Sequence, residues 1–142
     1  MDYTYHAKIE RDPDGGYIVT FPDVPEAITA GDDWNEALAN AQQALGLALR
    51  SYYMREKSPP PSLNHAGLTP ISLDVWNALK LETIRAFQEA GITKVELAKR
   101  LHKKEVEARR ILNANHPTKI QTLEKALNVL GKKAVVSVQE AA

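Results

Sequence analysis

Three consecutive prolines interrupt the chain near its middle, at Pro59, Pro60 and Pro61. Proline fixes its own backbone and lacks an N–H donor, so this run is excluded from a helix interior and from a central strand. It favours extended polyproline geometry and predicts a semi-rigid spacer, with a short edge strand as the alternative. The chain is therefore predicted to contain a first module (residues 1–57), a linker (58–69) and a second module (70–142).

The first module has the pattern of strands followed by a helix. Alternating side chains predict strands at residues 2–10 and 17–21, joined by a glycine-containing turn, and a short third strand at 27–30. Asp33 and Glu36 have the spacing of a helix capping box. The helix that follows carries an apolar stripe predicted to pack on the sheet: Trp34, Ala37, Leu38, Ala41, Leu45, Ala48, Leu49 and Tyr52.

The second module has a mainly helical pattern. Helices are predicted from residue 74 to Gly91, from Thr93 to residue 101, over 105–113, and from about 119 to Gly131. Glycine directly after the last apolar position is a typical helix C-terminus.

Residues 134–138 (AVVSV) predict a strand at the end of the second module, where residues 71–73 are the other extended segment. The backbone groups of an isolated strand require hydrogen-bonding partners. We therefore expect a small sheet completed across a subunit boundary, which makes the chain a homodimer and leaves a tetramer open.

Residues 93–112 follow the order of a helix-turn-helix motif. Thr93 and Glu96 form a predicted capping box, Ala98 is small where the two helices cross, and the connection between the helices is short. His102 occupies a turn position often held by glycine, which tolerates positive φ better. The alternative interpretation is a plain four-helix bundle whose lysines are merely solvated.

In a helix-turn-helix protein the second helix lies in the major groove of DNA. Its exposed positions are predicted to contact bases, with an arginine on guanine, the valine on a thymine methyl group and the glutamate on a cytosine amino group. These residues are Glu105, Val106, Arg109 and Arg110. The predicted phosphate contacts are Thr93, Lys94, Lys103, Lys104, Thr118 and Lys119.

The net charge is zero, but the two parts of the chain carry opposite charges. Residues 1–62 hold 10 acidic and 5 basic side chains, whereas residues 63–142 hold 8 acidic and 13 basic ones. A basic module attracts phosphate, and an acidic one suits a basic protein surface. This asymmetry predicts two modules with different partners.

Several classes of protein are excluded by composition. The chain has no cysteine, so disulfides and thiolate chemistry are excluded, and His6, His65, His102 and His116 lack metal-ligand spacing. No apolar run reaches the roughly 18 residues that span a bilayer, and the N-terminus lacks a signal-peptide pattern. We expect a cytoplasmic protein without membrane, metal or cofactor.

The string GGYIVTFPDVPEA at residues 15–27, followed by TAGD at 29–32, resembles the HicB family, the antitoxins of HicBA toxin–antitoxin pairs. The similarity continues through the linker into TKVELAKR at 93–100 and TKI at 118–120. It covers nearly the whole chain. The resemblance implies an α+β protein, in which a partial ribonuclease H-like hairpin-and-helix domain precedes a helical helix-turn-helix domain with a small dimerisation strand.

The resemblance also implies a mechanism. The first domain binds HicA, a small basic toxin that cleaves mRNA with a histidine, and the second represses the operon's own promoter. The toxin contacts are placed only at the level of the domain, with Asp23, Glu26 and Asp32 as candidates. A stand-alone repressor without a toxin remains the alternative. A nuclease is disfavoured because these carboxylates lie in loops or at a helix cap rather than converging on a metal site.

Overall fold

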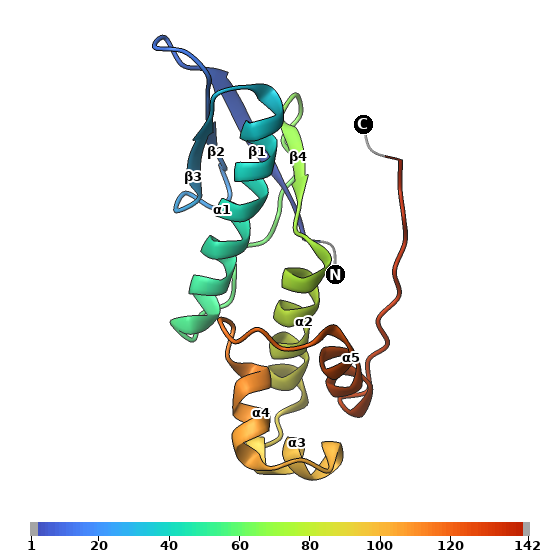
Figure 1. Cartoon of the computed structure of the whole chain (residues 1–142). Helices are drawn as coiled ribbons and strands as arrows, with labels where there is room; N and C mark the ends of the chain where they lie inside the picture. The colour runs from blue at the N-terminus through green and yellow to red at the C-terminus, as the bar shows by residue number, and fades with distance from the viewer. Residues whose placement is uncertain (1–2, 141–142) are drawn as a thin grey trace. The chain divides into compact units, whose positions relative to one another are not determined.

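The computed structural model describes residues 3–140, which divide into two compact units between Ala78 and Leu79. The N-terminal unit has an antiparallel four-stranded sheet with the order β3-β2-β1-β4 and one long helix (Figure 1). Its elements are β1 (Thr4–Arg11), β2 (Tyr17–Thr20), β3 (Ile28–Gly31), α1 (Trp34–Met54) and β4 (Thr69–Ser72).

The three strands predicted before the helix are confirmed. β1 and β2 are joined by a turn in which the Asp12 N–H donates to the Gly16 carbonyl, and both Gly15 and Gly16 have positive φ. The predicted alternation is also confirmed, since Tyr3, Tyr5 and Ala7 are buried. This periodicity directs one face of the sheet towards the core.

Helix α1 begins at the predicted cap and packs on the sheet. The Asp33 carboxylate accepts a hydrogen bond from the Glu36 N–H at 2.8 Å, which satisfies one of the unpaired donors at the helix start. Trp34 departs from the predicted stripe: it is 43% exposed and meets the ring of Tyr17 edge-on. The buried residues of the helix are Ala37, Ala41, Leu45, Gly46, Ala48, Leu49 and Tyr53.

Residues 69–72 correct the predicted arrangement of the sheets. We expected 71–73 to pair with a C-terminal strand, but β4 pairs with β1, with Tyr5 opposite Ile71 and Ala7 opposite Thr69. Pro70 is tolerated there because β4 is an edge strand, where a missing N–H need not interrupt a ladder.

Helix α2 (Val75–Ala90) leads into the C-terminal unit, which also contains α3 (Lys94–Leu101), α4 (Glu105–Leu112) and α5 (Ile120–Val129). The predicted stops are confirmed, because Gly91 and Gly131 follow α2 and α5 with φ values of 66° and 80°. The helices share a core of Ala86, Leu97, Ala98, Ala108, Leu127 and Leu130.

Residues 134–138 form no strand within the single described chain, and the predicted pairing across a subunit boundary stays a prediction. Their expected partner within the chain is already used by β1. Val135, Val136 and Val138 are between 68% and 91% exposed. Within residues 3–140, no helix is long and apolar enough to cross a membrane.

Candidate functional site

The pair α3–α4 has the predicted arrangement of two short helices joined by residues 102–104. The Thr93 hydroxyl accepts a hydrogen bond from the Glu96 N–H at 3.1 Å, so the predicted cap of α3 is present. His102 ends α3 in the left-handed region, with φ 55° and ψ 43°. In this conformation the Lys103 N–H turns back to the Ala98 carbonyl at 2.9 Å, which closes the helix end.

The four predicted base-contacting residues lie on the exposed surface of α4. Val106 is 50% exposed, and Arg109 is bound along the helix by Glu105, with 2.8 Å between Nη2 and Oε1. Ala108 and Ile111 form the opposite, buried face. The helix therefore presents a polar surface with two arginines. The guanidinium group of Arg109 is already paired with Glu105, so a ligand would have to share it with that carboxylate. The exposed set comprises Glu105, Val106, Arg109 and Arg110.

Five of the six predicted phosphate contacts are exposed. The structure places them at the start of α3, in the turn after α3 and directly before α5: Thr93, Lys94, Lys103, Lys104 and Lys119. Thr118 differs, because it is only 6% exposed and its hydroxyl receives a hydrogen bond from Lys80 at 2.7 Å. Its side chain is therefore committed to the interior of the unit.

Lys80 is the residue near this surface that the sequence analysis missed. Its side chain is completely buried, and its ammonium group donates to the Arg110 carbonyl at 3.1 Å and to the Thr118 hydroxyl at 2.7 Å. Burial lowers the pKa of Lys80 to about 8. A signal was present in the sequence: Lys80 lies three and four residues before Thr83 and Ile84, which share the buried face of α2.

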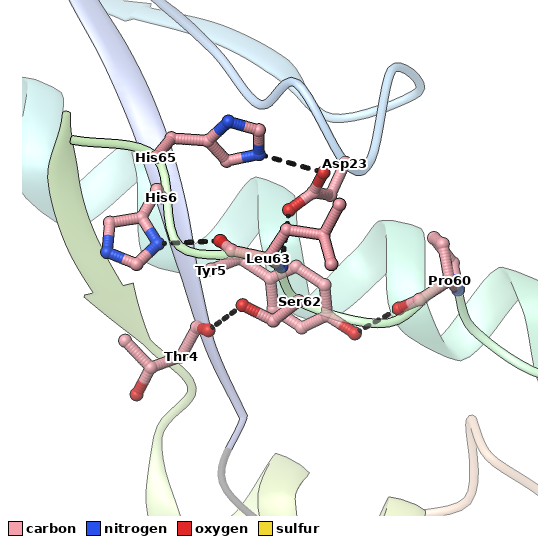
Figure 2. Close-up of polar contacts among 8 residues, drawn as sticks. All are labelled: Thr4, Tyr5, His6, Asp23, Pro60, Ser62, Leu63 and His65. Atoms are coloured by element: carbon pink, nitrogen blue, oxygen red, sulfur yellow. Dashed lines mark hydrogen bonds and ion pairs between the residues drawn. The ribbon is translucent and has the colours of Figure 1, made fainter.

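In the N-terminal unit, the predicted linker is bound to the sheet by side chains (Figure 2). The Tyr5 hydroxyl donates to the Pro60 carbonyl at 2.6 Å, and the Ser62 hydroxyl donates to the Thr4 carbonyl. The His6 ring also contacts the Leu63 carbonyl, with 3.1 Å between Nδ1 and the oxygen. The polyproline run is thus anchored along the first half of β1, a stretch outside the β1–β2 register.

Asp23, one of the candidate toxin contacts, contributes to this anchoring. Its two carboxylate oxygens accept from the Leu63 N–H at 2.8 Å and contact the His65 Nε2 at 2.9 Å. The Leu63 hydrogen bond, followed by the contact with His65, lowers the pKa of Asp23 below its ordinary value. Asp23 therefore joins the β2–β3 loop to the linker.

The other two candidates are exposed. Both carboxylate oxygens of Glu26 lie 2.7 Å from the Tyr52 hydroxyl, and this hydrogen bond lowers the pKa of Glu26. Asp32 lies directly before the cap of α1, and its N–H contacts the Glu36 carboxylate at 3.3 Å. Glu26 and Asp32 are accordingly available to a partner at the two ends of β3.

Within residues 3–140, no three histidine or carboxylate side chains are grouped so as to hold a metal ion. The Asp23 and Glu26 carboxylates instead take part in hydrogen bonds within the unit. The described residues expose carboxylates on the N-terminal unit, and arginines and lysines on the C-terminal one.

These observations define a modular α+β protein, with an acidic sheet-and-helix unit followed by a helical unit that carries a short helix, a turn and an exposed second helix. The family model for the HicB-like antitoxin of bacterial toxin–antitoxin systems matches residues 4–82. The chain belongs to this family of antitoxins, whose members are not enzymes.

Curated relatives extend the similarity over nearly the whole chain. Antitoxin HicB 1 of Photorhabdus laumondii is 37% identical over 136 residues, covering 95% of this chain and 86% of the relative. Antitoxin HicB of Escherichia coli K12 is 36% identical over 132 residues, covering 91% and 94%. Antitoxin HicB of Pseudomonas fluorescens is 29% identical over 149 residues, covering 98% and 96%.

Proposed function

We propose that this antitoxin binds and neutralises a small, basic, mRNA-cleaving HicA toxin through its N-terminal unit. The observation that carries the proposal is the family match, which covers the sheet, α1 and the linker at residues 4–82. Charge supports it, because residues 1–62 hold twice as many acidic as basic side chains. Opposite charges on two proteins accelerate their association and disfavour other partners. The exposed carboxylates of Glu26 and Asp32 are the proposed contacts.

We propose further that the C-terminal unit represses its own operon by binding promoter DNA. The base contacts are Glu105, Val106, Arg109 and Arg110, all exposed on α4. Proposed phosphate contacts come from Thr93, Lys94, Lys103, Lys104 and Lys119, while Thr118 is omitted because its hydroxyl is committed to Lys80. An exposed, arginine-bearing second helix suits the major groove, and flanking lysines suit the phosphates.

One helix-turn-helix motif reads a single half-site, so operator binding calls for a homodimer. We propose that residues 134–138 of two copies pair. The segment has the β-branched composition of a strand, and its valines are exposed in the single chain. The proposed place of action is the cytoplasm, where both mRNA and the operon are found.

The toxin-binding function is tested by purifying the tagged chain from its native host and measuring the intact masses of bound proteins. We expect a small basic protein in near-stoichiometric amount. Expressed alone, that protein should arrest growth and cleave mRNA, and co-expression of this chain should restore growth. A bare homodimer, with no such partner even after crosslinking, would instead favour a stand-alone repressor.

The DNA-binding surface is tested by two substitutions with different signatures. Arg109→Ala should weaken the free energy of binding to the operator by roughly 1–3 kcal/mol. It should also reduce the preference for one particular base pair in the operator. Lys119→Ala should weaken binding to all DNA sequences alike. It should also reduce the slope of log affinity against log salt concentration by about one. Unchanged operator affinity in Arg109→Ala would show that another face of the unit reads the bases.

A further inference from the structure

Among the described residues of the C-terminal unit, Lys80 is the one buried side chain that carries a charge; the others are apolar residues and the threonines Thr83 and Thr118. Removing an ammonium group from water is costly, so its retention in a core calls for an explanation. Its position supplies one. Two acceptors of Lys80 belong to segments on either side of residues 113–117: Arg110 lies in the last turn of α4, and Thr118 lies two residues before α5.

The Arg110 carbonyl is at the end of α4 where helical carbonyls lack intrahelical partners and carry partial negative charge. It accepts from the Asn113 N–H at 3.2 Å as well as from Lys80 at 3.1 Å. An ammonium group at this point gives the carbonyl a second hydrogen-bond donor and offsets the partial negative charge of the helix end. It also fixes the C-terminal turn of α4, which carries Arg109 and Arg110, against α2.

The Thr118 hydroxyl accepts from Lys80 at 2.7 Å and lies 3.2 Å from the Nδ1 atom of His116. Thr118 immediately precedes Lys119, the N-cap residue of α5. The same ammonium group therefore holds the end of the proposed base-reading helix and the residue beside a proposed phosphate contact. Both Arg110 and Thr118 are thus held by contacts to the Lys80 Nζ atom.

We propose that Lys80 is a positioning residue for operator recognition: from inside the core, it sets the distance between the base-reading face of α4 and the phosphate contact at the start of α5. This inference rests on the proposed DNA-binding function. Lys80 itself is fully buried, so in this role it acts through the residues that it holds and not by contact with DNA. Sequence-specific contacts depend on geometry, whereas non-specific attraction to phosphates depends mainly on charge at the surface. Lys80 should thus affect specificity rather than general affinity for DNA.

The test compares Lys80→Met, which keeps the approximate length of the side chain and removes its donors, with the wild-type full-length chain. The probes are a duplex carrying the promoter of its own operon and an unrelated duplex of equal length, each titrated at several salt concentrations. We expect Lys80→Met to lose about tenfold in promoter affinity. Affinity for the unrelated duplex should stay within about twofold of wild type, with the same salt dependence.

Thr83→Val is the matched control. Thr83 is also buried on α2, and its hydroxyl donates to the Leu79 carbonyl at 2.7 Å, within the same helix. This variant loses a buried hydrogen bond without disturbing the Lys80 contacts, so its promoter affinity should match that of wild type. Thr118→Val removes one Lys80 acceptor and should lower promoter affinity by a smaller factor than Lys80→Met.

When both single variants fold, a double-mutant cycle tests whether they remove the same contact. The effects of Thr118→Val and Lys80→Met on promoter affinity should be less than additive, because both break one interaction. Should Lys80→Met fail to fold, Thr118→Val alone must lower promoter affinity and spare the unrelated duplex. Wild-type promoter affinity in these variants, or equal losses on both duplexes, would overturn the positioning role. If the wild-type chain did not prefer its promoter, the proposed repressor function would itself be wrong.

Discussion

Replacing Gly31 with alanine should severely destabilise the N-terminal unit. A Cβ atom built at this position would lie 2.3 Å from the Ala37 nitrogen and 2.6 Å from the Ala37 Cα. Both atoms belong to the backbone of α1, so no side-chain rotation relieves the overlap. The first turn of the helix would have to move away from the sheet by roughly 1 Å to reach ordinary contact distance.

That movement has a cost that can be estimated. Overpacking a core costs about 1–3 kcal/mol when only side chains must shift, and here the helix backbone must shift. Ala37 and Ala41 are completely buried against the sheet and would lose contacts as α1 moved. We therefore expect a loss of at least about 3 kcal/mol in the free energy of unfolding. This is a large fraction of the roughly 5–15 kcal/mol that stabilises an ordinary domain.

Urea denaturation followed by tryptophan fluorescence measures the effect. The chain has two tryptophans, Trp34 and Trp76, and both lie in the N-terminal unit. With a typical slope of about 1–3 kcal/mol per molar urea, Gly31→Ala should lower the midpoint by roughly 1–3 M.

Gly46→Ala provides the control because it makes the same chemical change inside α1. Its added Cβ would meet only side-chain atoms, with the Asn77 Nδ2 at 3.2 Å. Alanine gains about 1 kcal/mol over glycine in a helix interior, which offsets the displacement of Asn77 from its bonds to Arg50 and Asp74. Its stability should stay within about 1 kcal/mol of wild type. Equal midpoints for Gly31→Ala and Gly46→Ala would refute the argument from close packing.

Three further predictions concern the turn, the buried lysine and the linker. His102→Gly should raise the free energy of unfolding by about 0.5–1 kcal/mol, because glycine adopts the left-handed conformation of this residue without steric cost. A melting temperature below that of wild type would contradict this prediction. The pKa of Lys80 is about 8 in the folded chain and 10.5 when the side chain is unperturbed, so the unfolded chain binds more protons between these pH values and stability rises with pH there. The free energy of unfolding of the wild type, followed by circular dichroism, should therefore increase by about 2 kcal/mol between pH 7 and 10. Lys80→Met should lack this increase. The pKa of Asp23 is lowered in the folded chain, so the stabilisation by its carboxylate is present above the ordinary value of 3.8 and is lost on acidification below it. Asp23→Asn should make the linker easier to cleave by protease at neutral pH. Unchanged cleavage would argue against the anchoring role.

Local signals in the sequence predicted much of the fold. The caps at Asp33 and Thr93 and the stops at Gly91 and Gly131 act within a few residues, and each is confirmed. The same holds for the order of the α3–α4 pair, since capping and the spacing of apolar residues depend on near neighbours. The glycine-containing turn between β1 and β2 was equally visible, because few other residues accept positive φ.

Contacts between distant residues could not be predicted from such signals. Thr69–Ser72 pairs with β1 although more than 60 residues separate them, and the short segment carries too few side chains to specify its partner. Thr118 looked like an exposed phosphate ligand, but the tertiary structure buries its hydroxyl on Lys80. Residues 58–69 were predicted as a semi-rigid spacer, and the tertiary structure adds that Tyr5 and Asp23 anchor this segment at Pro60 and Leu63.

The sequence by itself therefore determined the helices, their ends, the first three strands, the opposite charges of the two parts and the resemblance to HicB antitoxins. Only the tertiary structure decided where β4 pairs, how the linker is anchored and that a lysine lies in the core of the C-terminal unit. The physical reason is that helix ends and turns are set by interactions across a few residues, whereas strand partners and buried polar contacts depend on which distant segments meet when the chain folds.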